Sequence, residues 1–227
     1  FTKTVLGGDN TVVTALLVAF SVGVGIGSML CERLSGDRVE LGLVPVGSVG
    51  LTLFGISLYF SSPAQLPEQL LSLPQFLATA YGWWVLTDLT LIGVFGGLFI
   101  VPLYALLQQR AEPTQRARVI AANNIFNALF MVVSAIAGIV FLTVLDLAIP
   151  EYFLILAIMN AVVALYVYSQ LPEFVLRFVI YLLSHSMYRV QSHGLQHIPA
   201  EGAAVLVANH VSYVDALLIG GAVRRPV

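Results

Sequence analysis

The sequence predicts an all-α membrane bundle of five transmembrane helices, followed by the beginning of a small α/β domain. Three observations carry this prediction. First, 59% of the 227 residues are hydrophobic and only 10% are charged, with a mean hydropathy of +0.93, which is too apolar for an ordinary soluble domain. Second, five almost uncharged stretches are long enough to cross about 30 Å of hydrocarbon as helices. Third, a short apolar run near the C-terminus is followed by turn and helix signals.

The five predicted spans are separated by short polar or charged loops. They cover residues 10–31, 41–60, 84–108, 119–145 and 152–170. The first span contains Gly23, Gly25 and Gly27, and the Gly-x-x-x-Gly pair within it allows another helix to approach closely. We therefore expect tight helix packing there.

Two groups of polar side chains interrupt the apolar spans. Asp88 stands in the third span, where a carboxylate is by default a functional candidate, but the nearby interfacial Trp84 favours a hydrated Asp88 at the membrane surface. The fourth span carries Asn123, Asn124 and Asn127 at spacings that share a helix face. These amides could meet a polar headgroup in a cavity or bond to neighbouring helices. All four are candidate substrate-binding residues.

Loop charge predicts the orientation of the spans. The loops after the first four spans carry two, none, three and none of the Lys and Arg residues, and positive loops face the cytoplasm. The first span is therefore expected to enter from outside, and the segment after the fifth to emerge inside. An external start without a signal peptide predicts at least one upstream span, so we expect the chain to begin inside a longer protein.

Residues suited to chemistry stand together near the C-terminus. The run 203–208 predicts a buried strand, His210 follows in a turn, Ser212 suits a helix N-cap, and Asp215 falls at the third helical position. On one interpretation Asp215 belongs to a capping box at the positive helix end. On the other it orients His210 as a general base for a substrate hydroxyl. The two interpretations are compatible.

These residues carry a resemblance to a known enzyme family. The lead Gly194–Gly202 (GLQHIPAEG) and the sequence Asn209, His210, four residues and Asp215 resemble the first motif of the glycerolipid acyltransferases of the 1-acylglycerol-3-phosphate type. The resemblance implies an O-acyltransferase in which His210 is the catalytic base and Asp215 supports it. It also implies acyl-acyl carrier protein or acyl-coenzyme A as co-substrate, with no bound cofactor. The family's later motifs are absent, so this chain alone is expected to be inactive.

The spans carry a second resemblance. Residues 96–110 (GGLFIVPLYALLQQR) and 25–28 (GIGS) resemble the bacterial lysophospholipid transporters of the major facilitator superfamily. The resemblance implies that residues 1–170 are spans eight to twelve, the carboxy-terminal half of such a transporter. The loop 35–40 (SGDRVE) lacks the basic run usual in the superfamily, so no gating role is transferred to it.

Between the two regions, residues 171–189 begin with a proline suited to a helix start and are rich in aromatic side chains. We predict an interfacial linker helix on the cytoplasmic membrane face. Residues 190–227 are then the truncated N-terminal part of the acyltransferase domain.

Several site classes are not expected. The histidines His185, His193 and His197 lie near one another in sequence, but Gly194 and Pro199 break any common helix face, and no cysteine or acid completes a metal site. A net charge of −2 without a basic face gives no nucleic-acid footprint. Cys31, the single cysteine, permits no internal disulfide.

The two resemblances fit one function. They imply transport of lysophospholipid across the bacterial inner membrane by a multi-pass protein, and reacylation of that lipid by a cytoplasmic acyltransferase part. Lysophospholipid and acyl carrier protein are the implied partners. Two alternatives stay open: an acyltransferase that the helices merely anchor, and a facilitator-type transporter of another cargo.

Overall fold

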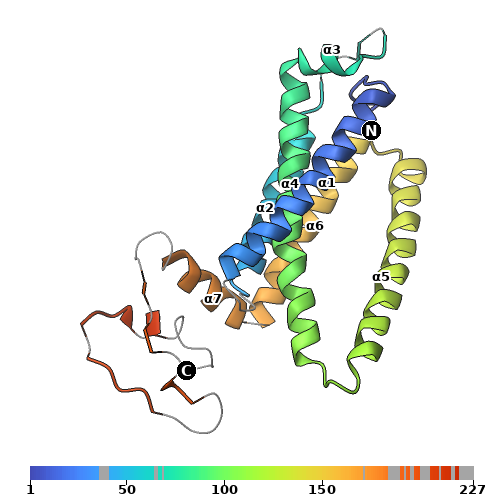
Figure 1. Cartoon of the computed structure of the whole chain (residues 1–227). Helices are drawn as coiled ribbons and strands as arrows, with labels where there is room; N and C mark the ends of the chain where they lie inside the picture. The colour runs from blue at the N-terminus through green and yellow to red at the C-terminus, as the bar shows by residue number, and fades with distance from the viewer. Residues whose placement is uncertain are drawn as a thin grey trace.

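The protein is described by a computed structural model, which is helical through most of its length (Figure 1). The described residues are 1–35, 41–63, 66–67, 69–170, 172–183, 190–191, 193–194, 197–199, 205–209, 211–215 and 218–219. Within these ranges the helices are α1 (Asn10–Ser35), α2 (Leu43–Phe60), α3 (Leu73–Leu77), α4 (Ala80–Arg110), α5 (Arg116–Ile139), its π-helical continuation η1 (Val140–Val144), α6 (Ile149–Gln170) and α7 (Pro172–Leu182).

Five of these helices are long and apolar enough to span a membrane: α1, α2, α4, α5 with η1, and α6. The predicted all-α membrane bundle is therefore confirmed. The third span begins at Ala80 and not at residue 84, because the Thr79 hydroxyl caps the helix by accepting a hydrogen bond from the backbone N–H of Gly82 at 3.1 Å.

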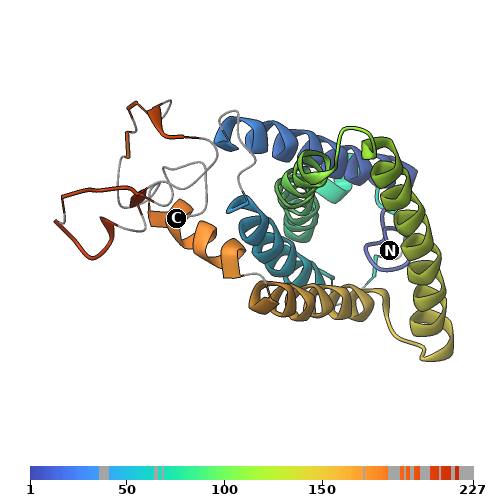
Figure 2. The same ribbon diagram turned by 90° about the horizontal axis from the view of Figure 1, so that it is seen from below.

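The helices pack around α4. Helix α1 packs along one side of α4 and α2 along another, while α6 packs on α2. Seen from below, α5 stands at the margin of the bundle (Figure 2), and none of its residues is buried. The core on which the site depends is thus α1, α2, α4 and α6.

Helices α1 and α4 meet backbone to backbone. Gly23 and Gly27 of α1 face main-chain atoms of α4, and Gly93 and Gly97 of α4 face main-chain atoms of α1. A Cβ atom at any of these four positions would overlap the backbone of the other helix, whereas one at Gly25 would meet nothing within 4 Å. The predicted close approach at Gly23 and Gly27 is confirmed, and the four residues are called the glycine seam below.

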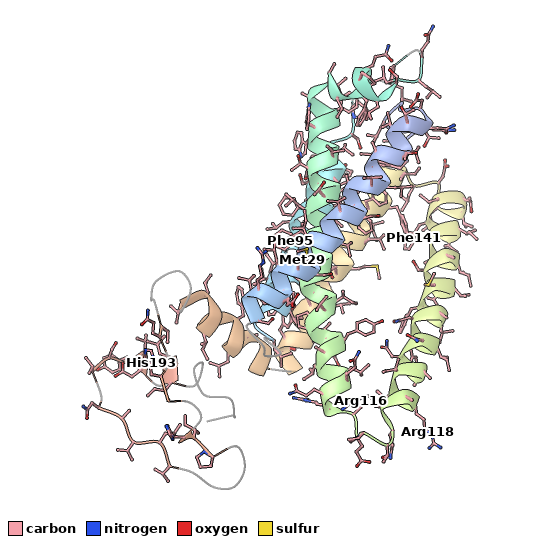
Figure 3. All side chains as sticks on the ribbon, viewed as in Figure 1. Met29, Phe95, Arg116, Arg118, Phe141 and His193 are labelled. Carbon is pink, nitrogen blue, oxygen red and sulfur yellow. The ribbon has the colours of Figure 1, made fainter. Side chains whose placement is uncertain are left out.

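The contact between α4 and α2 is made by an aromatic side chain, whereas the contact between α4 and α1 is made by backbone atoms. Phe95, labelled in Figure 3, stacks on Phe54 of α2 with ring centroids 5.5 Å apart. Its ring also covers Gly50 of α2, where a Cβ would overlap it. The missing side chain at Gly50 therefore makes the space that the phenylalanine fills.

The basic residues gather at one end of the bundle. Arg33 lies in the last turn of α1 and Arg110 ends α4. Arg116 and Arg118 open α5 at the same end (Figure 3). Helix α7 starts at Pro172, as expected, and leaves the bundle from this end (Figure 1). The opposite end is closed by the N-terminal residues, α3 and the chain around Leu71, which pairs with Gly8.

The α1 start is capped by Asp9. Its Oδ1 accepts hydrogen bonds from the backbone N–H groups of Thr11 at 2.8 Å and Val12 at 3.2 Å. The Thr11 hydroxyl donates to the same oxygen. This hydroxyl, ahead of the two backbone donors, holds the pKa of the Asp9 carboxyl below its usual value.

The strand expected over 203–208 is not formed where the structure describes that run. Residues 205–209 carry no regular secondary structure, and the side chains of Val205 and Val207 are 89% and 91% exposed. A strand needs a neighbouring strand for its backbone groups and a packed face for its side chains. The described part of the chain offers this run neither, so its apolar pattern alone does not produce a buried strand.

The glycine seam makes a stability prediction. Replacement of Gly27 with Ala should lower the thermal stability of the full-length protein in detergent, because the methyl group must push α1 away from α4 at a cost of about 1–3 kcal/mol. Gly25→Ala is the matched control, since it adds the same methyl in open space and gains up to about 1 kcal/mol of helix propensity. Equal melting temperatures for the two variants would contradict the close packing of α1 and α4 at the glycine seam.

Candidate functional site

A cavity of about 700 Å³ lies between α2, α4, α5 and α6. It sits beside the basic end of the bundle, because Arg110 at the end of α4 and Val119 in the first turns of α5 both line it. Most of its wall is aliphatic or aromatic. These apolar lining residues include Val44, Phe99, Leu103, Leu107, Val163 and Val167.

Seven polar side chains from four helices also line the cavity. They are Ser48, Tyr104, Arg110, Asn123, Asn127, Asn160 and Tyr168. A few polar groups in an otherwise apolar hollow are typical of a ligand site, because the apolar wall supplies affinity and the polar groups fix orientation.

Hydrogen bonds across the cavity wall tie the helices together. Asn127 Nδ2 donates to the Tyr104 hydroxyl at 2.8 Å, which links α5 to α4. Asn160 Nδ2 donates to the Ser48 carbonyl at 3.1 Å and to the Thr52 hydroxyl at 2.9 Å, which links α6 to α2. These two amides therefore have structural partners as well as a place in the cavity wall.

Asn123 differs from them. Its Nδ2 is buried and has no hydrogen-bond partner among the described residues. A buried amide N–H without a partner costs about 1–3 kcal/mol, so a ligand with an acceptor oxygen in the cavity would relieve that cost. Asn123 is the lining residue best placed to receive such a ligand.

The predicted substrate-binding residues are divided by the fold. The cavity brings together Asn123 and Asn127, but Asn124 is exposed and Asp88 lies elsewhere, and neither lines it. Sequence reasoning missed Arg110, Asn160 and the two tyrosines. A signal was present for Asn160, because it is an amide in the middle of an apolar span, where polar side chains are costly.

Asp88 is not hydrated at the membrane surface, contrary to expectation. It is 2% exposed and lies within α4, next to the buried Val85. Trp84 remains exposed, so the interfacial signal applies to the tryptophan and not to the acid one turn further on. Asp88 is buried because it lies one turn after Val85 on the face of α4 that packs against the bundle.

The C-terminal turn is held by Asp215. One carboxylate oxygen of Asp215 accepts hydrogen bonds from the backbone N–H of Val211 at 2.6 Å and of Ser212 at 2.7 Å. The bond to Ser212 is the carboxylate half of the predicted capping box. His210 lies outside the described residues, so the geometry between His210 and Asp215 is not given by the structure.

Comparison with known proteins agrees with this architecture. Residues 1–179 match the Major Facilitator Superfamily, and residues 189–227 match the Acyltransferase family. A lysophospholipid transporter, LplT, from Enterobacter sp. (strain 638) is 35% identical over 118 residues. That match covers 52% of this chain and 25% of the relative, so the chain spans about a quarter of the relative's length. No solved structure matches the chain significantly.

The superfamily match extends over the bundle and most of α7, and it begins with the first residue of the chain. The acyltransferase match begins after α7 and contains the Asn209, His210 and Asp215 motif. The bundle, its apolar cavity and the C-terminal turn thus correspond to two successive families. The chain belongs to the major facilitator superfamily, and its residues 189–227 are similar to the Acyltransferase family.

Proposed function

We propose that the protein moves lysophospholipid across the bacterial inner membrane and reacylates it on the cytoplasmic side. The observation that carries the proposal is the cavity, because its apolar wall suits an acyl chain and its polar groups suit a phosphate-bearing headgroup. The volume of about 700 Å³ lies within the range of about 300–1,000 Å³ of small-molecule sites. The similarity to a lysophospholipid transporter supports the same cargo.

The placement of charge supports this cargo in more detail. Arg110 is the one basic residue that lines the cavity among the described residues, and a guanidinium is suited to a phosphate diester because it offers planar paired donors. The buried donor of Asn123 stands on the facing helix. A headgroup between α4 and α5 would therefore contact the guanidinium of Arg110 on one side and the amide of Asn123 on the other.

The arginines also support an orientation. Arg33, Arg110, Arg116 and Arg118 gather at one end of the bundle, and basic loops favour the cytoplasm. Helix α7 leaves from that end (Figure 1). The acyltransferase part would then be cytoplasmic, in the compartment where acyl-acyl carrier protein and acyl-coenzyme A are found.

In the proposed acyl transfer, His210 removes the proton from the free glycerol hydroxyl of the lysophospholipid. The alkoxide oxygen attacks the thioester carbonyl, and the tetrahedral intermediate expels the thiolate, which takes the proton from the imidazolium. Asp215 stabilises that imidazolium. It also accepts hydrogen bonds from the backbone N–H groups of Val211 and Ser212, the residues that follow His210.

The sequence left two alternative functions: an acyltransferase that the helices merely anchor, and a transporter of another cargo. In an acyltransferase that is merely anchored, the spans need no polar cavity, so the convergence of Asn123, Asn127 and Asn160 on one cavity supports transport over anchorage. A facilitator of another cargo would share the cavity. The acyltransferase match supports a lipid cargo, because it supplies an enzyme that consumes one.

The cavity predicts a difference between two neighbouring asparagines. Asn123→Leu should reduce the uptake of labelled lysophosphatidylethanolamine by vesicles containing the full-length protein by about two- to tenfold, the value of one neutral hydrogen bond. Asn124→Leu, the same change at an exposed position outside the cavity, should leave uptake unchanged. Equal effects of the two variants would count against the cavity, and wild-type uptake no greater than that of empty vesicles would count against the function.

The proposed base predicts that transport and acylation separate. His210→Ala should lower acyl transfer from the thioester by about 10²- to 10⁴-fold while uptake of the lipid stays at the wild-type level. His193→Ala, at an exposed histidine earlier in the same region, is the control and should retain acylation. Unchanged acylation in the His210 variant would overturn the assignment of the base.

The proposed catalytic role of Asp215 can be distinguished from its capping role by one substitution. In Asp215→Asn the side-chain oxygen can still accept from the amides of Val211 and Ser212, so thermal stability should change by no more than about 1 kcal/mol. Acyl transfer should nevertheless fall at least tenfold, because a neutral amide does not stabilise an imidazolium. Wild-type acylation in this variant would leave Asp215 with a capping role alone.

A further inference from the structure

Asn160 is a polar group of the cavity wall that the proposed headgroup contacts do not use. It stands in the middle of α6, an apolar span, and it lines the cavity. The headgroup contacts come from Arg110 on α4 and Asn123 on α5, and both of these side chains offer hydrogen-bond donors. An amide inside an apolar span is costly, so a second polar group of the ligand is expected beside Asn160.

The amide of Asn160 is held in one orientation. Its Nδ2 donates to the Ser48 carbonyl at 3.1 Å and to the Thr52 hydroxyl at 2.9 Å. The Thr52 hydroxyl donates its own proton to the same Ser48 carbonyl at 3.1 Å. A flipped amide would place its oxygen against that carbonyl, which can only accept. Both amide hydrogens are therefore used within the protein, and Oδ1 is the atom that remains for a ligand.

Asn160 Oδ1 is accessible from the cavity. Within the described part of the chain, the hydrogen bonds of the Asn160 side chain are the two that Nδ2 donates. The buried side-chain atoms without a partner are Ser62 Oγ, Asp88 Oδ2 and Asn123 Nδ2. Asn160 Oδ1 is not one of them, so it is not sealed inside the packing. Because Asn160 lines the cavity, this oxygen is an acceptor that a ligand can reach.

The other two asparagines of the cavity wall differ in this respect. Asn123 presents a buried donor, Nδ2. Asn127 Nδ2 donates to the Tyr104 hydroxyl at 2.8 Å, but a hydroxyl can donate as well as accept, so this partner allows either end of the Asn127 amide to face it. Among the described residues that line the cavity, Asn160 is thus the amide whose acceptor is fixed by its partners.

The acceptor lies deeper in the bundle than the guanidinium. Asn160 is bonded to Ser48, and the neighbouring Gly47 lies against the backbone of Phe99 on α4. Arg110 is eleven residues further along α4, which is about 16 Å at 1.5 Å per residue. A glycerophospholipid runs in the order headgroup, phosphate, glycerol and acyl chain. With its phosphate near Arg110, the part that reaches deeper towards Asn160 is the glycerol and not the headgroup amine.

We propose that Asn160 is a specificity-determining residue that accepts a hydrogen bond from the free glycerol hydroxyl of a lysophospholipid. This role rests on the proposed transport function. A lipid with two acyl chains carries an ester at that position and has no proton to donate, so Oδ1 would face another acceptor. The same hydroxyl is acylated in the proposed transfer. The product would therefore lose the group by which the cavity binds the substrate.

The hydroxyl contact is tested by uptake into vesicles that contain the full-length protein. Lysophosphatidylethanolamine is compared with its 2-deoxy analogue, in which a hydrogen atom replaces the glycerol hydroxyl. Wild-type protein should take up the natural lipid about five- to tenfold faster, the value of one neutral hydrogen bond. In Asn160→Leu the two rates should agree to within about twofold. A loss of packing alone would lower both rates together and leave their ratio unchanged.

Two further variants complete this experiment. Asn127→Leu removes another amide of the cavity wall and should keep the preference for the hydroxyl, whatever its effect on the total rate. Thr52→Val removes one of the two partners that orient the Asn160 amide and should weaken the preference at least about twofold, which also serves if Asn160→Leu does not fold. Wild-type protein without a preference, or equal loss of it in the Asn127 and Asn160 variants, would overturn the proposal.

An N–H group of the headgroup could also donate to Asn160, and lysophosphatidylcholine separates the two sources because its headgroup has no N–H. The preference for the hydroxyl over the 2-deoxy analogue should persist with this lipid and again be lost in Asn160→Leu. A preference for ethanolamine over choline that depends on Asn160, without a preference for the hydroxyl, would overturn the proposal. Uptake of every lipid at the level of empty vesicles would refute transport and this role with it, whereas uptake without a hydroxyl preference would refute the role alone.

Discussion

The glycine seam between α1 and α4 is the contact on which the rest of the bundle depends. In hydrocarbon, two helices gain nothing from burying apolar side chains against each other, because lipid tails are equally apolar. Their association must come from close packing, and close packing requires the absence of Cβ atoms where the backbones cross. Gly23 and Gly27 on one helix and Gly93 and Gly97 on the other meet this requirement reciprocally.

The seam determines where α4 presents its remaining faces. With one face fixed on α1, another carries Phe95 into the space above Gly50 of α2. The C-terminal half of α4 then supplies Phe99, Leu103 and Arg110 to the cavity. Helix α5 is joined to this frame through the Asn127 to Tyr104 hydrogen bond, and none of its residues is fully buried.

The polar groups of the bundle fall into two sets, one at each end of the helices. Arginines and the cavity stand at one end, while Asp88, Ser57 and Trp84 stand towards the other. A buried polar group in a membrane protein is costly and is kept where it has a task. Three buried side-chain atoms of the described residues have no hydrogen-bond partner, Ser62 Oγ, Asp88 Oδ2 and Asn123 Nδ2, and of these residues only Asn123 lines the cavity.

The sequence by itself determined the five spans, the small-residue contact in the first, and the carboxylate cap at Asp215, because hydropathy, glycine spacing and capping are local properties. It also carried the resemblance to both families. Only the tertiary structure decided that Asn123 and Asn127 share a cavity while Asn124 does not, and that Asp88 is buried. It also added Arg110 and Asn160 to the cavity. Which face of a helix meets a neighbour depends on the packing of other helices, and in an apolar span the periodicity that would reveal that face is absent.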